Sequence, residues 1–272
     1  MARIPLEDNF TDVIGKAQRG LHITDADLAG RAGISTEDLA ALKSGRPLVA
    51  VLRRVARHLR LSPDALEALA TNAWYPAQPN FPTGFAAFNT RYDDMTVNSY
   101  LVWDARSKQA AAFDTGADSQ ALVDTAAAEH LSVRYLFLTH THEDHIADLA
   151  RLVAATGAEV WSHEKEPLPG AKTFRENAHF HLGPLAIKTL LTPGHSPGLT
   201  TFYVTGLSWP LAVTGDAIFA SSIGGSTTDF EQQYRATRDK VLSLPRDTVL
   251  APGHGPLTTV AQEKQANPFF AR

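Results

Sequence analysis

The first 74 residues have apolar positions at helical spacing. Apolar residues recur three or four positions apart in series that end at Ala32, Leu42 and Leu59. Thr24 and Ser35 precede two of these series, each with an aspartate three residues later, which is typical of a helix N-cap. The pattern predicts a bundle of about five short helices over residues 1–74.

The pattern changes after residue 74. Prolines at three of the nine positions 74–82 prevent regular structure, so residues 75–82 are predicted to be a linker. Residues 83–272 then alternate β-type runs with helical stretches. The predicted strands are Phe85–Phe88, Val97–Trp103, Ala110–Phe113, Tyr135–Leu138, Val160–Ser162, Ile187–Leu191, Thr200–Val204 and Leu211–Val213, and the predicted helices are Asp118–Glu129, Ile146–Thr156 and Phe230–Leu242. This order predicts a layered α/β domain.

Length and composition narrow the classes of protein. At 272 residues with 44% hydrophobic residues, the chain is long enough for two unequal globular domains. The net charge of −4 gives no bulk reason to expect nucleic acid or an anionic membrane as partner. Neither a secretory signal nor a membrane-length apolar run is recognisable, which predicts a soluble cytoplasmic protein. Because the chain has no cysteine, any metal must be bound by histidines and carboxylates.

The 11 histidines are unevenly distributed. His140 and His142 directly follow the predicted strand Tyr135–Leu138, and their alternate positions in an extended segment point both imidazoles to one side. Asp144 and His145 follow at the start of the next helix, where they can face a neighbouring position. Four ligand-type side chains in six residues predict a metal site.

Three later segments each add one ligand-type residue. His195, Asp216 and His254 each come shortly after a predicted strand or short apolar run, and both histidines lie in loops rich in glycine and proline. Rigid scaffolds present functional groups in such loops, so we expect these three side chains to complete the same site.

The full set resembles the HxHxDH…H…D…H motif of the metallo-β-lactamase superfamily. The resemblance covers about residues 83–272 and extends to Phe113–Asp118 and to Pro252–Thr259. It implies an αββα sandwich with two bound metal ions. In that arrangement the first ion would be bound by His140, His142 and His195, the second by Asp144, His145 and His254, and both by Asp216.

The resemblance also implies a chemistry. Two divalent ions, zinc or alternatively iron or manganese, would lower the pKa of a bridging water and polarise a substrate carbonyl, so that an ester or thioester is hydrolysed without a protein nucleophile. Asp144 is the expected catalytic residue, since a carboxylate ligand there could orient the hydroxide. Asp114 and Asp118 are expected to support the site or to cap a helix.

Several branches of the superfamily remain open as hypotheses. Exported β-lactamases are not expected to have the bridging Asp216, and homoserine-lactone lactonases have tyrosine where this chain has Phe219. The glyoxalase II (hydroxyacylglutathione hydrolase) group resembles this chain best. Its rival is the persulfide dioxygenase type, which binds one iron through residues matching His140, His195 and Asp216. Since Ser222–Phe230 has no basic residue for a glutathione carboxylate, the substrate's thiol and acyl group stay open.

The N-terminal helices resemble a helix-turn-helix of the phage-repressor type over Ile23–Leu69. In that resemblance Ser35–Ser44 would enter the major groove, with Lys43 and Arg46 as candidate DNA contacts. Residues 1–75, however, carry 10 basic and 9 acidic residues, a poor balance for binding phosphates. We therefore favour a module that packs on the enzyme, mediates self-association or shields the cleft. A metabolite-sensing DNA-binding regulator is the alternative, and the oligomeric state is open.

Overall fold

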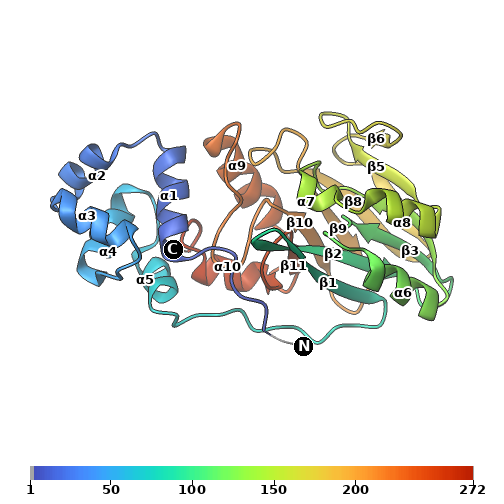
Figure 1. The fold of residues 1–272 in the computed structure, drawn as a ribbon. Helices are drawn as coiled ribbons and strands as arrows, with labels where there is room; N and C mark the ends of the chain where they lie inside the picture. Colours follow the sequence, from blue (N-terminus) through green and yellow to red (C-terminus); the bar gives the residue numbers. More distant parts are fainter. Residues whose placement is uncertain (1–2, 272) are drawn as a thin grey trace.

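The computed structural model describes residues 3–271 as a group of helices beside a two-sheet sandwich (Figure 1). The first 70 residues form the helices α1 (Phe10–Gly20), α2 (Asp25–Ala32), α3 (Thr36–Lys43), α4 (Val49–His58) and α5 (Pro63–Ala70). Thr24 and Ser35 cap α2 and α3, since their hydroxyls accept the backbone N–H of Asp27 and Asp38 at 3.2 and 3.0 Å. The predicted number of helices and these two starts are confirmed.

Two six-stranded mixed sheets follow in the chain. The first has the strand order β1-β2-β3-β4-β5-β6 and the second β12-β11-β10-β9-β8-β7. Their bounds are β1 (Phe85–Tyr92), β2 (Met95–Trp103), β3 (Gln109–Phe113), β4 (Ser132–Phe137), β5 (Glu159–His163), β6 (Lys172–Phe174), β7 (His179–Leu182), β8 (Leu185–Leu191), β9 (Thr200–Thr205), β10 (Leu211–Gly215), β11 (Val249–Pro252) and β12 (Thr258–Thr259). The parallel pairs are β3 to β6 in the first sheet and β10 with β11 in the second.

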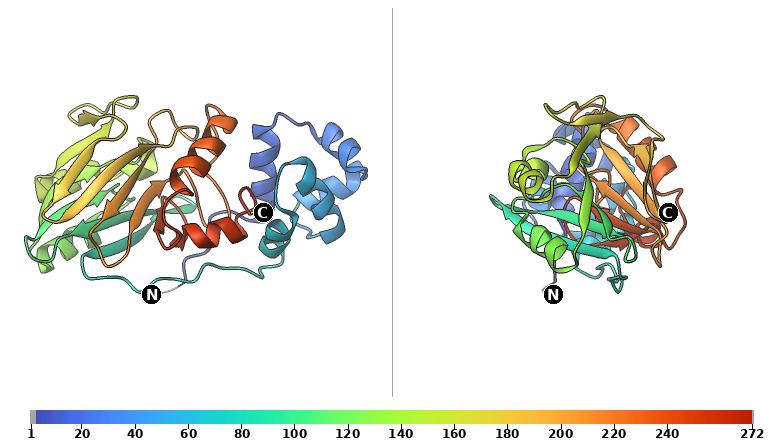
Figure 2. Two further views of the ribbon diagram at one scale, coloured as in Figure 1. Left: turned by 180° about the vertical axis from the view of Figure 1, so that it is seen from behind. Right: turned by 90° about the vertical axis from the view of Figure 1, so that its right-hand side faces the viewer.

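Helices cover both outer faces of the sheets (Figure 2). The first sheet is covered by α6 (Gln120–Ala128) and α8 (Leu149–Thr156), with the short α7 (Glu143–Ile146) at its edge; the second is covered by α9 (Phe230–Ala236), a π-helical turn η1 (Thr237–Val241) and α10 (Val260–Ala266). The αββα sandwich expected from the sequence is therefore confirmed.

The core between the two sheets is largely aromatic. The rings of Phe113, Phe137 and Phe202 lie 5.0 to 5.6 Å apart and join both sheets. Strand β2 is buried on both faces, because Tyr100 points into this core and Leu101 into the layer under α6 and α8. A strand covered on both sides loses the polar alternation of a half-exposed strand, as its sequence shows.

Two predicted helices are interrupted. The predicted helix Ile146–Thr156 is wrong at its start, because α7 ends at Ile146 and α8 begins only after Asp148. The Asp148 carboxylate accepts the N–H and hydroxyl of Ser119 at 2.8 Å, which ties this break to the start of α6. The second predicted helix, Phe230–Leu242, changes to η1 at Thr237. The predicted strands lack β6, β7, β11 and β12, which have only 3, 4, 4 and 2 residues.

The helical part packs directly on the sandwich. Buried residues of α1 to α5 belong to the same apolar cluster as Phe269 and Phe270 near the C-terminus. The Phe230 side chain of α9 lies against Gly20 of α1, and the N–H of Ser62 donates to the carbonyl of Pro268 at 2.7 Å. The helices and the sandwich are thus held by apolar contact.

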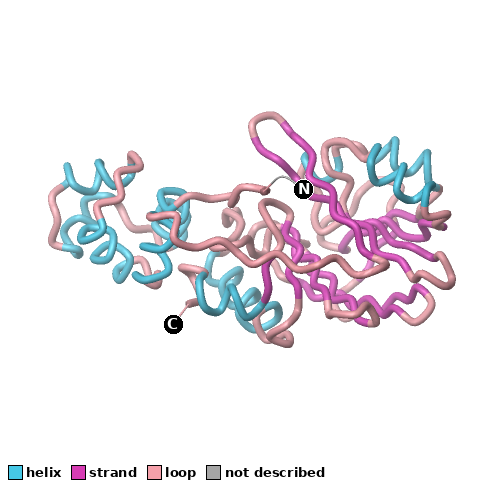
Figure 3. The backbone as a smooth tube through the Cα atoms, turned by 90° about the horizontal axis from the view of Figure 1, so that it is seen from below, coloured by secondary structure: helices cyan, strands magenta, loops and turns pink. Residues whose placement is uncertain are grey.

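Two loop segments, residues 3–9 before α1 and residues 71–84 between α5 and β1, lie along the surface of the sandwich and lead to the helical part; we call both connecting segments (Figure 3). Residues 75–82 have no regular structure, as predicted from their prolines. Gln78 in this segment donates to the carbonyl of Leu257 at 2.8 Å, and the Trp209 indole donates to the carbonyl of Asn80 at 3.2 Å. Among the described residues, no helix is both long and apolar enough to cross a membrane.

Candidate metal centre

Four loops bring the seven candidate ligands together at one edge of the sandwich. They follow β4, β8, β10 and β11, and α7 carries two of the residues. Because β10 and β11 are parallel neighbours, the loops after them, with Asp216 and His254, leave the second sheet at the same edge.

The first group of ligand atoms consists of imidazole nitrogens. His142 Nδ1 lies 3.1 Å from His140 Nε2 and 2.9 Å from His195 Nε2. Three nitrogens so close together can face one cation.

The second group adds carboxylate oxygens. Asp144 Oδ2 lies 3.2 Å from His254 Nε2 and 3.4 Å from His145 Nε2. Asp216 stands between the groups, with Oδ2 3.4 Å from His195 Nε2 and 3.5 Å from His254 Nε2. The geometry therefore places one carboxylate within reach of both sets of nitrogens.

Two atoms in this cluster indicate that a cation fits. His145 Nε2 and Asp216 Oδ1 are buried and have no hydrogen-bond partner among residues 3–271, although they lie 3.4 Å apart. Leaving buried polar atoms unpaired costs about 1–3 kcal/mol each. A metal ion coordinated by both would remove this cost, so the donor set and its burial fit a metal centre.

The far ring nitrogens of three histidines are anchored. His145 Nδ1 lies 2.8 Å from Asp114 Oδ2, His195 Nδ1 2.7 Å from the carbonyl of Gly225, and His254 Nδ1 2.7 Å from the carbonyl of Thr96. Each of these nitrogens donates its N–H, which leaves the lone pair of Nε2 facing the cluster. The histidines are thus oriented as metal ligands would be.

A model of the metallo-beta-lactamase superfamily matches residues 92–254 of this sequence. The chain belongs to this superfamily.

Relatives within the superfamily have different activities. Hydroxyacylglutathione hydrolase GloC of Haemophilus influenzae is 32% identical over 198 residues, which cover 64% of this chain and 92% of that protein. Mitochondrial persulfide dioxygenase ETHE1 of Homo sapiens is 31% identical over 186 residues, covering 62% of this chain and 70% of that protein. The solved structure of BLEG-1 B3 metallo-beta-lactamase superposes with a TM-score of 0.59 at 27% identity, covering 69% of this chain and all of that one.

Loop geometry explains how the candidate ligands are brought together. Asp114, at φ 54°, accepts the backbone N–H of Thr139 at 2.7 Å and its hydroxyl at 2.8 Å, so the ends of β3 and β4 are joined. Gly253 precedes His254, and a Cβ there would clash with Asp216 Oδ1. Glycine is therefore required where the β11 loop passes the second group.

The electrostatics of the site favour ionised carboxylates beside histidines. Burial would raise the pKa of Asp216, yet His254 and His195 hold it well below its usual range. Burial lowers the pKa of both His140 and His195. Burial lowers the pKa of His254, but the Asp216 and Asp144 carboxylates together have the larger effect and raise this pKa to about 9. The carboxylates thus attract a proton to His254, and a metal ion bound there would have to displace that proton.

Sequence reasoning did not indicate every residue that contacts the candidate ligands. The carbonyls of Thr96 and Gly225 anchor two histidines, and no side-chain pattern could have indicated them. Asp114 supports the site as expected. Asp118 is exposed; its carboxylate accepts the N–H of Gln120 at 2.9 Å at the start of α6.

The two candidate DNA contacts lie in the helical part. The Lys43 ammonium, at the end of α3, contacts the Asp25 carboxylate at 2.7 Å and the Gln18 amide oxygen at 3.2 Å. Arg46 follows α3 and is exposed. One of the two cations is therefore already neutralised within the bundle.

Proposed function

We propose that this chain is a binuclear metal-dependent hydrolase that cleaves a thioester or ester, similar to hydroxyacylglutathione hydrolases. The observation that carries the proposal is the second group of Asp144, His145 and His254, which is complete and oriented beside the first. A site for one ion, bound by His140, His195 and Asp216, would not need the second group.

The residues have distinct roles in this proposal. The first ion would be held by His140, His142 and His195, the second by Asp144, His145 and His254, and Asp216 would be shared. Two divalent ions, for which we propose zinc with iron or manganese as alternatives, would supply hydroxide at neutral pH and polarise the substrate carbonyl.

Asp144 is the proposed catalytic residue. Its carboxylate is partly exposed, whereas His145 beside it is fully buried. One oxygen lies near His254 Nε2 and His145 Nε2, so the other oxygen can accept a hydrogen bond from the attacking water and orient it toward the carbonyl carbon.

A second candidate is persulfide oxidation at a single iron. It is favoured by the 31% identity to human persulfide dioxygenase ETHE1 and by the placement of Asp216 Oδ2 3.4 Å from His195 Nε2. Under this proposal, His140, His195 and Asp216 would hold the ion.

Elemental analysis of protein purified anaerobically without added metal separates the candidates. About two zinc ions per chain, with hydrolysis of a panel of thioesters and esters, supports the hydrolase. One iron per chain with oxygen uptake on a glutathione persulfide would overturn it. Turnover of a chromogenic β-lactam instead of thioesters would also contradict it. The variant His254→Asn should lose one of two ions, and the exposed His58→Asn is the matched control.

For the N-terminal helices we propose a packing role on the enzyme rather than DNA binding. The shared apolar cluster with Phe269 and the neutralised Lys43 support this role. A metabolite-sensing DNA-binding regulator remains the alternative. It would be favoured if the chain bound thioesters without hydrolysing them.

A further inference from the structure

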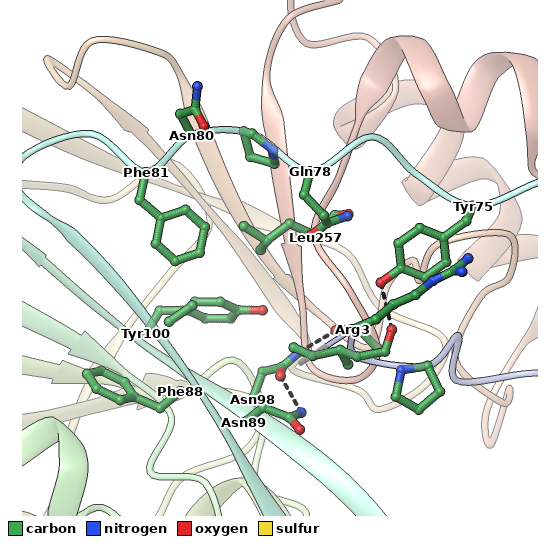
Figure 4. A pocket seen from close by; sticks show the side chains of 15 residues that line it. Arg3, Tyr75, Gln78, Asn80, Phe81, Phe88, Asn89, Asn98, Tyr100 and Leu257 are labelled. Carbon is green, nitrogen blue, oxygen red and sulfur yellow. Dashed lines mark hydrogen bonds between the residues drawn. The ribbon is translucent and has the colours of Figure 1, made fainter. Parts of the chain in front are cut away.

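A cavity lies beside the metal centre and is separate from it. Its volume is about 760 Å³, and none of the seven candidate ligands lines it. Its walls come from three parts of the chain, namely the N-terminal segment Arg3–Pro5, the connecting segment around Tyr75–Phe81, and the edge of the sandwich at β1, β2 and Leu257 (Figure 4). The cavity therefore forms only where the connecting segments meet the sandwich.

One end of the cavity is aromatic. Phe81, Tyr100 and Leu257 lie around it, whereas the Phe88 side chain points away from it, toward the layer under α6 and α8 (Figure 4). Phe81 is 39% exposed, one of two large apolar side chains exposed to this degree in residues 3–271. The apolar part of a ligand could be buried against the exposed Phe81 ring and the rings beside it.

The opposite end carries a cation. The Arg3 guanidinium lies 3.7 Å from the ring centre of Tyr75, whose hydroxyl donates to the carbonyl of Ile4 at 2.7 Å. Within the described part of the chain, no carboxylate forms an ion pair with Arg3. Asn89 and Asn98 add amide groups to the floor between the two ends. A planar anion such as a carboxylate could accept hydrogen bonds from two guanidinium N–H groups of Arg3.

We propose that this cavity binds an amphipathic carboxylate, whose anionic group pairs with Arg3 and whose aromatic body lies against Phe81, Tyr100 and Leu257. The charge and the apolar walls stand at opposite ends, as such a molecule requires. This site is independent of the hydrolase proposal, because it uses none of the candidate metal ligands.

A ligand bound in the cavity would affect the metal centre through Asn98 on the cavity floor. The Asn98 amide donates to the carbonyls of Pro252 and Gly255, both at 2.9 Å, and these residues flank His254 in the β11 loop. The ligand would also join both connecting segments to the sandwich. It would therefore stabilise the attachment of the helical part.

Calorimetric titration of the full chain with 4-phenylbutyrate tests the proposal, with the neutral 4-phenylbutyramide as the matched ligand. Both are titrated into metal-loaded and chelator-treated protein. We expect one binding event per chain for the carboxylate in both forms. Arg3→Gln should weaken the carboxylate about 10-fold and leave the amide unchanged, whereas Phe81→Ala should weaken both. Arg46→Gln, an exposed arginine outside the cavity, should change neither.

Three outcomes would overturn the assignment. The first is no saturable binding of 4-phenylbutyrate at millimolar concentration. The second is loss of binding on chelation, which would place the carboxylate at the metal centre. The third is an equal effect of Arg3→Gln on the affinities for 4-phenylbutyrate and 4-phenylbutyramide, which would show that the charge of Arg3 does not contribute to binding. Both substituted side chains lie at the surface or in a connecting segment, so the variants should fold, as circular dichroism would verify.

Discussion

Substituting Glu263 by glutamine should change how the stability of the chain depends on pH. This carboxyl, in α10, is fully buried. It accepts the N–H of Ser221 at 3.0 Å, the amide of Asn267 at 2.8 Å and the hydroxyl of Thr258 at 2.7 Å. Burial raises its pKa from 4.5 to about 7, and these hydrogen bonds only partly oppose the rise.

The sign and size of the effect follow from this pKa. Below pH 4.5 the Glu263 carboxyl is protonated in both the folded and the unfolded chain. Between pH 4.5 and 7 only the unfolded chain ionises, so the free energy of unfolding falls as pH rises. A shift of about 2.5 units corresponds to roughly 3 kcal/mol, all of which is lost above pH 7. Glutamine cannot titrate. Its amide N–H can donate a hydrogen bond to the Thr258 hydroxyl, while its amide oxygen accepts the hydrogen bonds from Ser221 and Asn267.

Urea unfolding of chelator-treated protein at pH 5, 6, 7 and 8 measures the effect. We expect the stability of Glu263→Gln relative to the parent to rise by about 2–3 kcal/mol from pH 5 to pH 8. Taking the difference between variants cancels the titration of all other groups. The exposed Glu37→Gln is the control and should show a flat difference. A flat or falling difference for Glu263→Gln would refute the reasoning.

Three further predictions concern the metal centre and the helices. Gly224→Ala should lower the rate of hydrolysis about 10-fold or more, because the added methyl group clashes with the backbone oxygen of Asp216. Gly225→Ala is the control and should retain activity, since a methyl group there has nothing within 4 Å. Equal losses of activity in the two variants would contradict this prediction. Asp114→Asn should weaken metal binding about 10- to 100-fold in competition with a chromogenic chelator, and unchanged affinity would show that its hydrogen bonds do not orient the site. Duplex DNA should show no salt-dependent binding, since Lys43 is already paired; a steep salt dependence would favour the regulator.

The part of the site that sequence could indicate consists of side chains next to strands. His140 and His142 follow β4 directly, and the ends of β10 and β11 bring Asp216 and His254 to one edge. Spacing within a loop and position after a strand are local properties, so they can be read without coordinates. The αββα order of layers, by contrast, is implied only by the resemblance to the metallo-β-lactamase superfamily, because the hydrophobic pattern by itself predicts no more than a layered α/β domain.

The rest depends on contacts between segments far apart in sequence. Backbone carbonyls such as those of Thr96 and Gly225 carry no side-chain signal, yet they orient His254 and His195. The break between α7 and α8 depends on Asp148 reaching Ser119. The cavity lined by Arg3 and Phe81 likewise needs residues from both ends of the helical part and from the sandwich.

The structure also bears on which thioester the proposed hydrolase would take. The segment Ser222–Phe230 has no basic side chain of its own. Lys16 of α1 contacts this segment, since its ammonium donates to the carbonyl of Ile223 at 2.8 Å. Lys16 is also paired with Asp8, and that carboxylate accepts the hydroxyl of Ser222 as well. A cation neutralised in this way cannot hold the carboxylates of a glutathione moiety. If the hydrolase proposal holds, thioesters with a small neutral thiol should therefore be preferred to glutathione thioesters in the value of kcat/KM, and the reverse preference would show that a glutathione carboxylate is bound elsewhere.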